Sequence, residues 1–192
     1  MALLKKSDLQ EKLRKSSGFL AESSIRNFAE SELRTAKLAA DRSAATYDIF
    51  LSHSSEDAIY IKALRDQLVE VGFTVYVDWI DDPQLDRSNV TKHTAAVLRT
   101  RMNSCQSLLY ATSQAAKKSV WMPWELGFMD SKTDARIAIV PIVDDNQADT
   151  EFRGQEYLGL YPYFDKTGDS FWIHASSRNY VRFKEWLAGA NP

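Results

Sequence analysis

The sequence predicts an α/β protein with a flavodoxin-like parallel sheet of five strands that is covered by helices on both faces. Two observations support this fold class. Short runs of β-branched and aromatic residues alternate with longer amphipathic segments, which is the pattern of successive strand–helix units. One run, residues 137–142, is almost entirely apolar, as a strand buried on both faces of a parallel sheet should be.

The predicted elements follow in a regular order along the chain. Strands are expected at residues 46–51, 73–77, 107–111, 137–142 and 171–173. Helices are expected at residues 59–71, 90–102 and 177–187, and a further helix starts near Trp121. Gly72 ends the first of these helices, and a long loop at residues 78–89 follows the second strand.

The beginning of the chain differs in composition from the rest. It contains neither Trp nor Pro, whereas all five residues of each type lie in the later part. Two helices are expected here, one that starts at Ser7, whose spacing from Gln10 resembles a capping box, and one over residues 21–43. We therefore predict a helical N-terminal extension, residues 1–45, before a main domain of residues 46–192. The extension either caps the core of that domain or serves as an assembly or sensing element.

Composition excludes several classes of function. The formal charge of −2 over 192 residues gives no reason to expect nucleic acid or an anionic membrane as a partner. Cys105 is the only cysteine, so no intramolecular disulfide can form, which fits a reducing compartment. The start of the chain lacks the apolar run of a signal peptide, and no stretch approaches the roughly eighteen apolar residues of a membrane span. We therefore expect a cytoplasmic protein.

Polar and aromatic residues follow the first three predicted strands. They are Ser52 and His53 after the first strand, Asp78 and Trp79 after the second, and Thr112 and Ser113 after the third. In open α/β sheets, ligands bind outside the carboxyl ends of the strands. These residues, together with Trp121 and Glu125 on the next helix, are therefore expected to converge on a binding site at one edge of the sheet.

Trp121 and Glu125 are the most informative pair in that constellation. Residues four apart lie on one face of a helix, so both side chains should look out of the same side. A flat ring beside a carboxylate can hold a nucleotide base or a nicotinamide ring and stabilise positive charge that develops on the attached sugar. The alternative is structural: Trp121 and Trp124 belong to the core, and Glu125 is an acid that stabilises the helix N-terminus.

Other kinds of site have little support in the sequence. The histidines, His53, His93 and His174, are far apart, and no HxxxH or CxxC spacing occurs, so no metal site is expected. Neither a GxGxxG nor a GxxxxGK[ST] motif is present. Cys105 precedes a buried strand and is not expected to act as a nucleophile. His53 is either a site residue or a structural histidine, and residues 99–101 are expected to form a solvated basic face.

Three segments resemble the Toll/interleukin-1 receptor (TIR) domain of the bacterial type. Residues 47–57, YDIFLSHSSED, are similar to the family's first strand and the loop after it. Residues 75–78 and the long loop beyond them match the second strand and the loop that mediates TIR–TIR contacts. The pattern Ser119-x-Trp121-x-x-x-Glu125 matches the Ser-x-Trp-Cys-x-x-Glu element of the TIR domains that consume NAD⁺.

The resemblance covers residues 46–188 and departs from the family at two places. Met122 stands where cysteine is usual, which removes a thiol but no essential acid. Residues 149–168, rich in Tyr and Gly, do not align with the family pattern.

The resemblance implies an enzyme that cleaves the bond between nicotinamide and ribose in NAD⁺. Glu125 would be the catalytic residue, since a carboxylate can stabilise the oxocarbenium-like transition state of such a reaction. Trp121 would stack near the nicotinamide, Ser52 and His53 would line the floor of the pocket, and Trp79 would belong to its loop wall. NAD⁺ is then the substrate, and neither a metal nor a further cofactor is expected.

The resemblance also implies partners and a biological setting. The product would be ADP-ribose, a cyclic form or a conjugate, sensed by a downstream effector in bacterial anti-phage defence. Self-association through TIR–TIR contacts is expected, with residues 79–89 as the contact loop, and neither nucleic acid nor a membrane is an expected partner.

Two other functions remain open at this stage. One is a non-catalytic TIR adaptor, which is disfavoured because an adaptor has no need of an acid four residues from an exposed Trp121. The other is a nucleoside deoxyribosyltransferase, which has a similar sheet and uses a glutamate nucleophile on the same class of bond.

Overall fold

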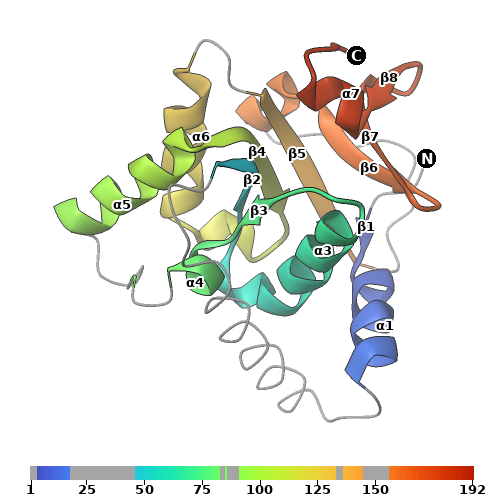
Figure 1. The fold of residues 1–192 in the computed structure, drawn as a ribbon, viewed down its shortest axis with the longest axis horizontal. Helices are drawn as coiled ribbons and strands as arrows, with labels where there is room; N and C mark the ends of the chain where they lie inside the picture. The colour runs from blue at the N-terminus through green and yellow to red at the C-terminus, as the bar shows by residue number, and fades with distance from the viewer. Residues whose placement is uncertain (1–3, 18–45, 83–84, 86–90, 133–135, 145–155) are drawn as a thin grey trace.

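The fold is built on one mostly parallel sheet. A computed structural model describes residues 4–17, 46–82, 85, 91–132, 136–144 and 156–192. Eight strands form the sheet in the order β3-β2-β4-β5-β6-β7-β8, with β1 also paired to β5 (Figure 1). The predicted α/β class is therefore confirmed.

Four parallel strands form the centre of the sheet. They are β2 (Tyr47–Ser52), β3 (Val75–Tyr76), β4 (Cys105–Thr112) and β5 (Arg136–Val143). Each overlaps a strand predicted from the sequence. The register places Leu51 beside Leu109 and Leu109 beside Ala138, so apolar side chains line up across the middle of the sheet.

Helices cover both faces of the sheet, as predicted. Their bounds are α1 (Lys6–Ser17), α3 (Ala58–Glu70), α4 (Asp78–Asp81), α5 (Lys92–Asn103), α6 (Trp121–Asp130) and α7 (Phe183–Leu187), with short 3-10 helices η1 (Ser55–Asp57), η2 (Ala116–Lys118) and η3 (Glu156–Leu160). One core cluster joins α1, α3 and α7 to the sheet, and a second joins α5 and α6 to the opposite face (Figure 1). Neighbouring residues of β4 divide between them, Leu108 into one and Leu109 into the other, because side chains alternate along a strand.

The prediction of five strands was wrong, because the end of the chain adds a hairpin edge. β6 (Tyr163–Thr167) pairs parallel to β5, and β7 (Ser170–Ser176) and β8 (Asn179–Arg182) follow antiparallel. The helix predicted at residues 177–187 begins only at Phe183. Tyr180 and Phe183 have helical spacing, but Tyr180 instead pairs with His174 across the hairpin. The Ser176 hydroxyl accepts hydrogen bonds from two backbone amides of the turn and thereby favours the hairpin.

The first described residues pack against the main domain. β1 (Leu4–Lys5) is a strand, not helix as predicted, and pairs parallel to the carboxyl end of β5. Leu4 and Leu9 are buried in the same core cluster as α3. The described part of the predicted extension therefore caps the sheet. The helix predicted at residues 21–43 lies outside the described residues, and the domain boundary at residue 45 stays a prediction.

Within the described part of the chain, no helix is long and apolar enough to cross a bilayer.

The packing of α1 generates a prediction about stability. Leu9 is fully buried, so Leu9→Ala should lower the free energy of unfolding by about 2–5 kcal/mol, the usual cost of such a cavity. Glu11→Ala on the exposed side of the same helix should cost less than about 1 kcal/mol. Denaturant unfolding measures both, and equal stabilities of the two variants would show that α1 is not part of the folded core.

Candidate functional site

The centre of the candidate site is a buried hydrogen bond between Ser52 and Glu125. Ser52 is the last residue of β2, and Glu125 lies in the second turn of α6. The Ser52 hydroxyl donates to Glu125 Oε2 at 2.6 Å, and both residues are 0% exposed. A buried carboxylate is stable only where donors satisfy it. The bond therefore fixes Glu125 at the carboxyl edge of the sheet, where the sequence predicted a site.

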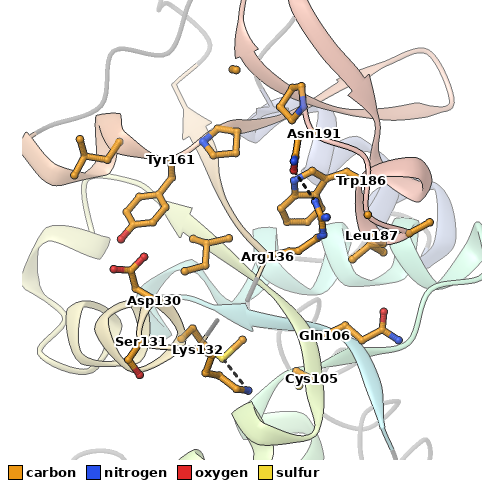
Figure 2. A pocket seen from close by; sticks show the side chains of 18 of the residues that line it. Cys105, Gln106, Asp130, Ser131, Lys132, Arg136, Tyr161, Trp186, Leu187 and Asn191 are labelled. Carbon is orange, nitrogen blue, oxygen red and sulfur yellow. Dashed lines mark hydrogen bonds between the residues drawn. The ribbon is translucent and has the colours of Figure 1, made fainter. Parts of the chain in front are cut away.

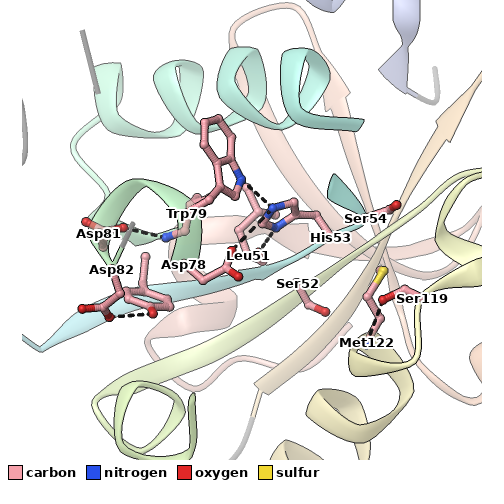
Figure 3. A network of polar contacts seen from close by, with 12 residues as sticks. Leu51, Ser52, His53, Ser54, Asp78, Trp79, Asp81, Asp82, Ser119 and Met122 are labelled. Carbon is pink, nitrogen blue, oxygen red and sulfur yellow. Dashed lines mark hydrogen bonds and ion pairs between the residues drawn. The ribbon is translucent and has the colours of Figure 1, made fainter. Parts of the chain in front are cut away.

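The segment before Glu125 explains why the carboxylate lies there. The Ser119 hydroxyl accepts a hydrogen bond from the Met122 backbone amide at the start of α6 (Figure 3). Pro123 lies in the first turn of the helix, where a missing N–H costs nothing. The Ser119-x-Trp121-x-x-x-Glu125 pattern thus starts a helix and directs its second turn at the end of β2.

The helix-terminus interpretation of Glu125 is wrong. The first turn of α6 contains no acidic residue, and the Glu125 carboxylate is bonded to a side chain of a strand. Its contact joins residues 73 positions apart in the sequence. Glu125 is therefore held by the sheet and not by the helix dipole.

Trp121 is buried, and the expectation that it is exposed was wrong. Only 7% of it is accessible, and it packs in the core cluster below α6. Its ring meets Trp124 edge to face at 5.4 Å. In this conformation Trp121 is therefore a core residue, as the structural alternative predicted. The reason is that α6 is apolar on most of its surface and turns this ring inward. Contact between Trp121 and a substrate stays a prediction.

His53 and Trp79 meet one strand away from Glu125. Trp79 Nε1 donates to His53 Nε2 at 2.6 Å, and His53 Nδ1 contacts the Leu51 carbonyl oxygen at 2.8 Å (Figure 3). An indole nitrogen only donates, so Nε2 of His53 carries no proton. Nδ1 therefore carries the hydrogen and donates it to Leu51. His53 is buried, and the Oδ1 atom of the buried Asp78 also lies 3.6 Å from its Nε2.

The short helix α4 holds Trp79 in place through acids that no sequence pattern indicated. Asp82 accepts two hydrogen bonds from Arg101, at 2.7 and 2.9 Å, and one from the Tyr76 hydroxyl at 2.8 Å. Asp81 accepts from the Val77 backbone amide. Burial raises the pKa of Tyr76 and of Asp81. The prediction that Arg101 belongs to a solvated face was therefore wrong, since it fixes the end of α4.

A second buried pair supports the same edge. The Ser113 hydroxyl donates to the Asp57 carboxylate and accepts hydrogen bonds from two backbone amides at the start of η2. Burial raises the pKa of Asp57, an effect that the Ser113 hydrogen bond opposes. Ser113 was placed at this edge from the sequence, but no local pattern identified Asp57 as its partner.

Other predicted chemistries have no support at this edge. Cys105 is buried at the opposite end of β4, and burial raises the pKa of its thiol to about 12. Among the described residues, no cluster of three or more His, Cys, Asp or Glu side chains could hold a metal ion. The absence of a metal from the function stays a prediction.

A cavity of about 1180 Å³ lies away from this constellation, at the amino ends of β4 and β5 (Figure 2). Arg136 extends into it but donates to the Ala190 carbonyl and lies over the Trp186 ring. None of the residues predicted for the site lines this cavity.

Comparison with known proteins gives three matches. The TIR domain family matches residues 49–180 of the chain, a segment that contains every predicted site residue. A Bacillus cereus (strain MSX-D12) protein named "Probable 3' cyclic ADP-D-ribose synthase ThsB'" is 50% identical over 147 residues, 73% of this chain and 75% of that protein. A Cytobacillus dafuensis protein named "Putative cyclic ADP-D-ribose synthase TIR2" is 29% identical over 83 residues, 43% of this chain and 22% of that protein.

The contact between His53 and Trp79 generates a prediction about protonation. At neutral pH, long-range ¹H–¹⁵N spectra should show His53 as the neutral tautomer with hydrogen on Nδ1, because Nε2 accepts from Trp79. Trp79→Phe keeps an aromatic ring but removes the donor, and the same tautomer should persist because the Leu51 carbonyl oxygen still accepts from Nδ1. His93, exposed on α5, serves as the internal reference. Hydrogen on Nε2 of His53 in the unmodified protein would contradict the assignment.

Proposed function

The chain belongs to the TIR domain family, and from that premise we propose that it is an enzyme that breaks the bond between nicotinamide and ribose in NAD⁺. The observation that carries the proposal is the buried Glu125 carboxylate, fixed by Ser52 at the carboxyl edge of the sheet. The names of the two relatives, both cyclic ADP-D-ribose synthases, support the same substrate.

The reaction needs one well-placed negative charge. The nicotinamide–ribose bond breaks, and its electron pair leaves with nicotinamide, which becomes neutral. Positive charge then develops on the ribose ring, as in glycoside hydrolysis. A preorganised carboxylate stabilises that charge without solvent reorganisation. Glu125 supplies this group, Ser52 fixes its orientation, and no metal or further cofactor takes part.

The second half of the reaction decides the product. An oxygen nucleophile bonds to the anomeric carbon, and its proton passes to the Glu125 carboxylate and from there to solvent. Water as nucleophile gives ADP-ribose, whereas a hydroxyl of the same dinucleotide gives a cyclic product. The names of the relatives favour the cyclic product for this chain. We infer that a downstream effector in anti-phage defence senses it, and that the reaction takes place in the cytoplasm.

Access to the carboxylate requires a change of conformation. Glu125 is fully buried and Trp121 nearly so, and substrate must reach both. We infer that self-association opens or completes the site, with residues 79–89 as the contact. The prediction that this segment is a loop from residue 78 onward was wrong, because Asp78–Asp81 form α4. Residues 83–84 and 86–89 of that segment lie outside the described residues. The burial of Glu125 also fits an adaptor without activity, in which this acid only stabilises the fold. No observation favours a deoxyribosyltransferase.

Glu125→Gln separates the catalytic from the adaptor function. The amide keeps the size of the side chain and an oxygen that can accept from Ser52, but it removes the charge. NAD⁺ cleavage should fall by a factor of about 10²–10³, the usual cost of losing such an electrostatic contact. The melting temperature and oligomer size should stay unchanged. Glu185→Gln, an exposed acid on α7, is the matched control. If Glu125→Gln cleaves NAD⁺ at nearly the unmodified rate, Glu125 is not catalytic and the adaptor function remains.

Self-association generates a prediction about concentration. If neighbouring domains open the site, the specific rate of NAD⁺ cleavage should rise with protein concentration and be low in the dilute monomer. Rates recorded from nanomolar to tens of micromolar protein, together with the oligomer size by light scattering, measure this dependence. A rate strictly proportional to protein concentration over that range would show that a single chain is sufficient.

A further inference from the structure

A second cavity borders the Glu125 site on its other side. It has a volume of about 510 Å³, within the usual range for small-molecule pockets. The end of β4, η2, the start of α6 and η3 form its walls. Thr112, which the sequence placed at the binding edge, lines it, whereas Ser52, His53, Trp79, Trp121 and Glu125 do not.

Tyr110 is the wall that this cavity shares with the candidate site. It pairs with Ser52 in the register of β2 and β4, and Ser52 holds Glu125. Tyr110 and Glu125 are close enough to interact electrostatically. On its other side, Tyr110 is hydrogen bonded to Tyr157 of η3. Burial raises the pKa of Tyr110 to about 12, so it is a neutral phenol at physiological pH. Only Tyr110 therefore separates a molecule in the cavity from the Glu125 carboxylate.

The lining has the chemistry of a nucleotide site. Lys117 contributes a positive charge, is exposed, and makes no ion pair within the described part of the chain. Tyr157 is 44% exposed and offers a ring on which a base can stack. Thr112 and Ser119 contribute hydroxyls. The lining also contains Glu156, a carboxylate that can accept from ribose hydroxyls.

The backbone at Glu156 is unusual. Its φ is +46°, a left-handed conformation that few residues other than glycine adopt. Conformations of this kind concentrate at ligand-binding and catalytic positions, where the surrounding structure maintains them. Here the strained residue begins η3 and places Glu156 and Tyr157 side by side on the cavity wall.

We propose that this cavity binds the adenosine diphosphate part of the dinucleotide, with Lys117 facing the two phosphates and Tyr157 facing the adenine. The proposal rests on the proposed function and deepens it, since it places the two ends of NAD⁺ on either side of Tyr110. The adenosine ribose then lies on the Glu125 side of the cavity, where its hydroxyl can replace water as nucleophile.

Calorimetric titration of the full chain with ADP tests the subsite without any cleavage. Lys117→Ala should weaken ADP binding by about tenfold, because it removes a charge-assisted contact to phosphate. Tyr157→Ala should weaken it by a similar factor of about ten through loss of stacking. Lys118→Ala is the matched control, since this neighbouring lysine is paired with Glu56 and does not line the cavity.

The same variants have distinct effects on turnover. Lys117→Ala should raise KM for NAD⁺ about tenfold with little change in kcat, and it should leave the cleavage of nicotinamide riboside unchanged. Tyr157→Ala should raise the ratio of ADP-ribose to cyclic product, because water competes once the adenosine part is loose.

Two results would overturn the subsite. One is no binding of ADP by the unmodified protein at millimolar concentration, and the other is equal affinity for ADP in the Lys117→Ala and Lys118→Ala variants. Either result leaves the effect of Glu125→Gln on NAD⁺ cleavage untouched. Conversely, failure of the unmodified protein to cleave NAD⁺ would contradict the proposed function. The titration with ADP would still decide whether the cavity binds a nucleoside diphosphate.

Discussion

The structure depends on keeping the Glu125 carboxylate buried. Burying an unpaired charge costs several kcal/mol, so the fold must supply donors wherever Glu125 lies. Ser52 is the donor that the end of β2 provides, at 2.6 Å. This contact requires β2 to end beside β4, and α6 to start where the Ser119 hydroxyl accepts from the Met122 amide. The strand order, the start of α6 and the geometry of the site therefore depend on one another.

The remaining polar pairs at this edge hold the segments around that carboxylate. Trp79 donates to His53, Arg101 fixes the end of α4 through Asp82, and Ser113 donates to Asp57. Each joins a loop to an adjacent strand or helix. Such surroundings support the proposed role of Glu125, because preorganised groups stabilise a short-lived cation without reorganising during the reaction.

Local patterns predicted the central strands and the edge at which the site lies. The apolar run at residues 137–142 and the motif that ends at Glu125 each carry their information within a few positions. Most of the features that the sequence did not predict depend on contacts between distant residues. The bond from Arg101 to Asp82 spans 19 positions and that from Ser113 to Asp57 spans 56, and no periodicity encodes such pairs. The burial of Trp121 depends likewise on how α6 meets the sheet, and the β7–β8 hairpin on a turn that Ser176 stabilises.

The most direct test of the account is a double-mutant cycle on Ser52 and Glu125, read as nicotinamide released from NAD⁺. Ser52→Ala alone should lower kcat about tenfold or more, and it should cost nothing further when Glu125→Gln is already present, because the two residues act as one unit. Ser107→Ala, which removes another fully buried strand hydroxyl bonded to the Asp48 carbonyl, should leave kcat unchanged. An equal loss from Ser52→Ala in both backgrounds, or none in either, would contradict the claim that Ser52 holds the catalytic carboxylate.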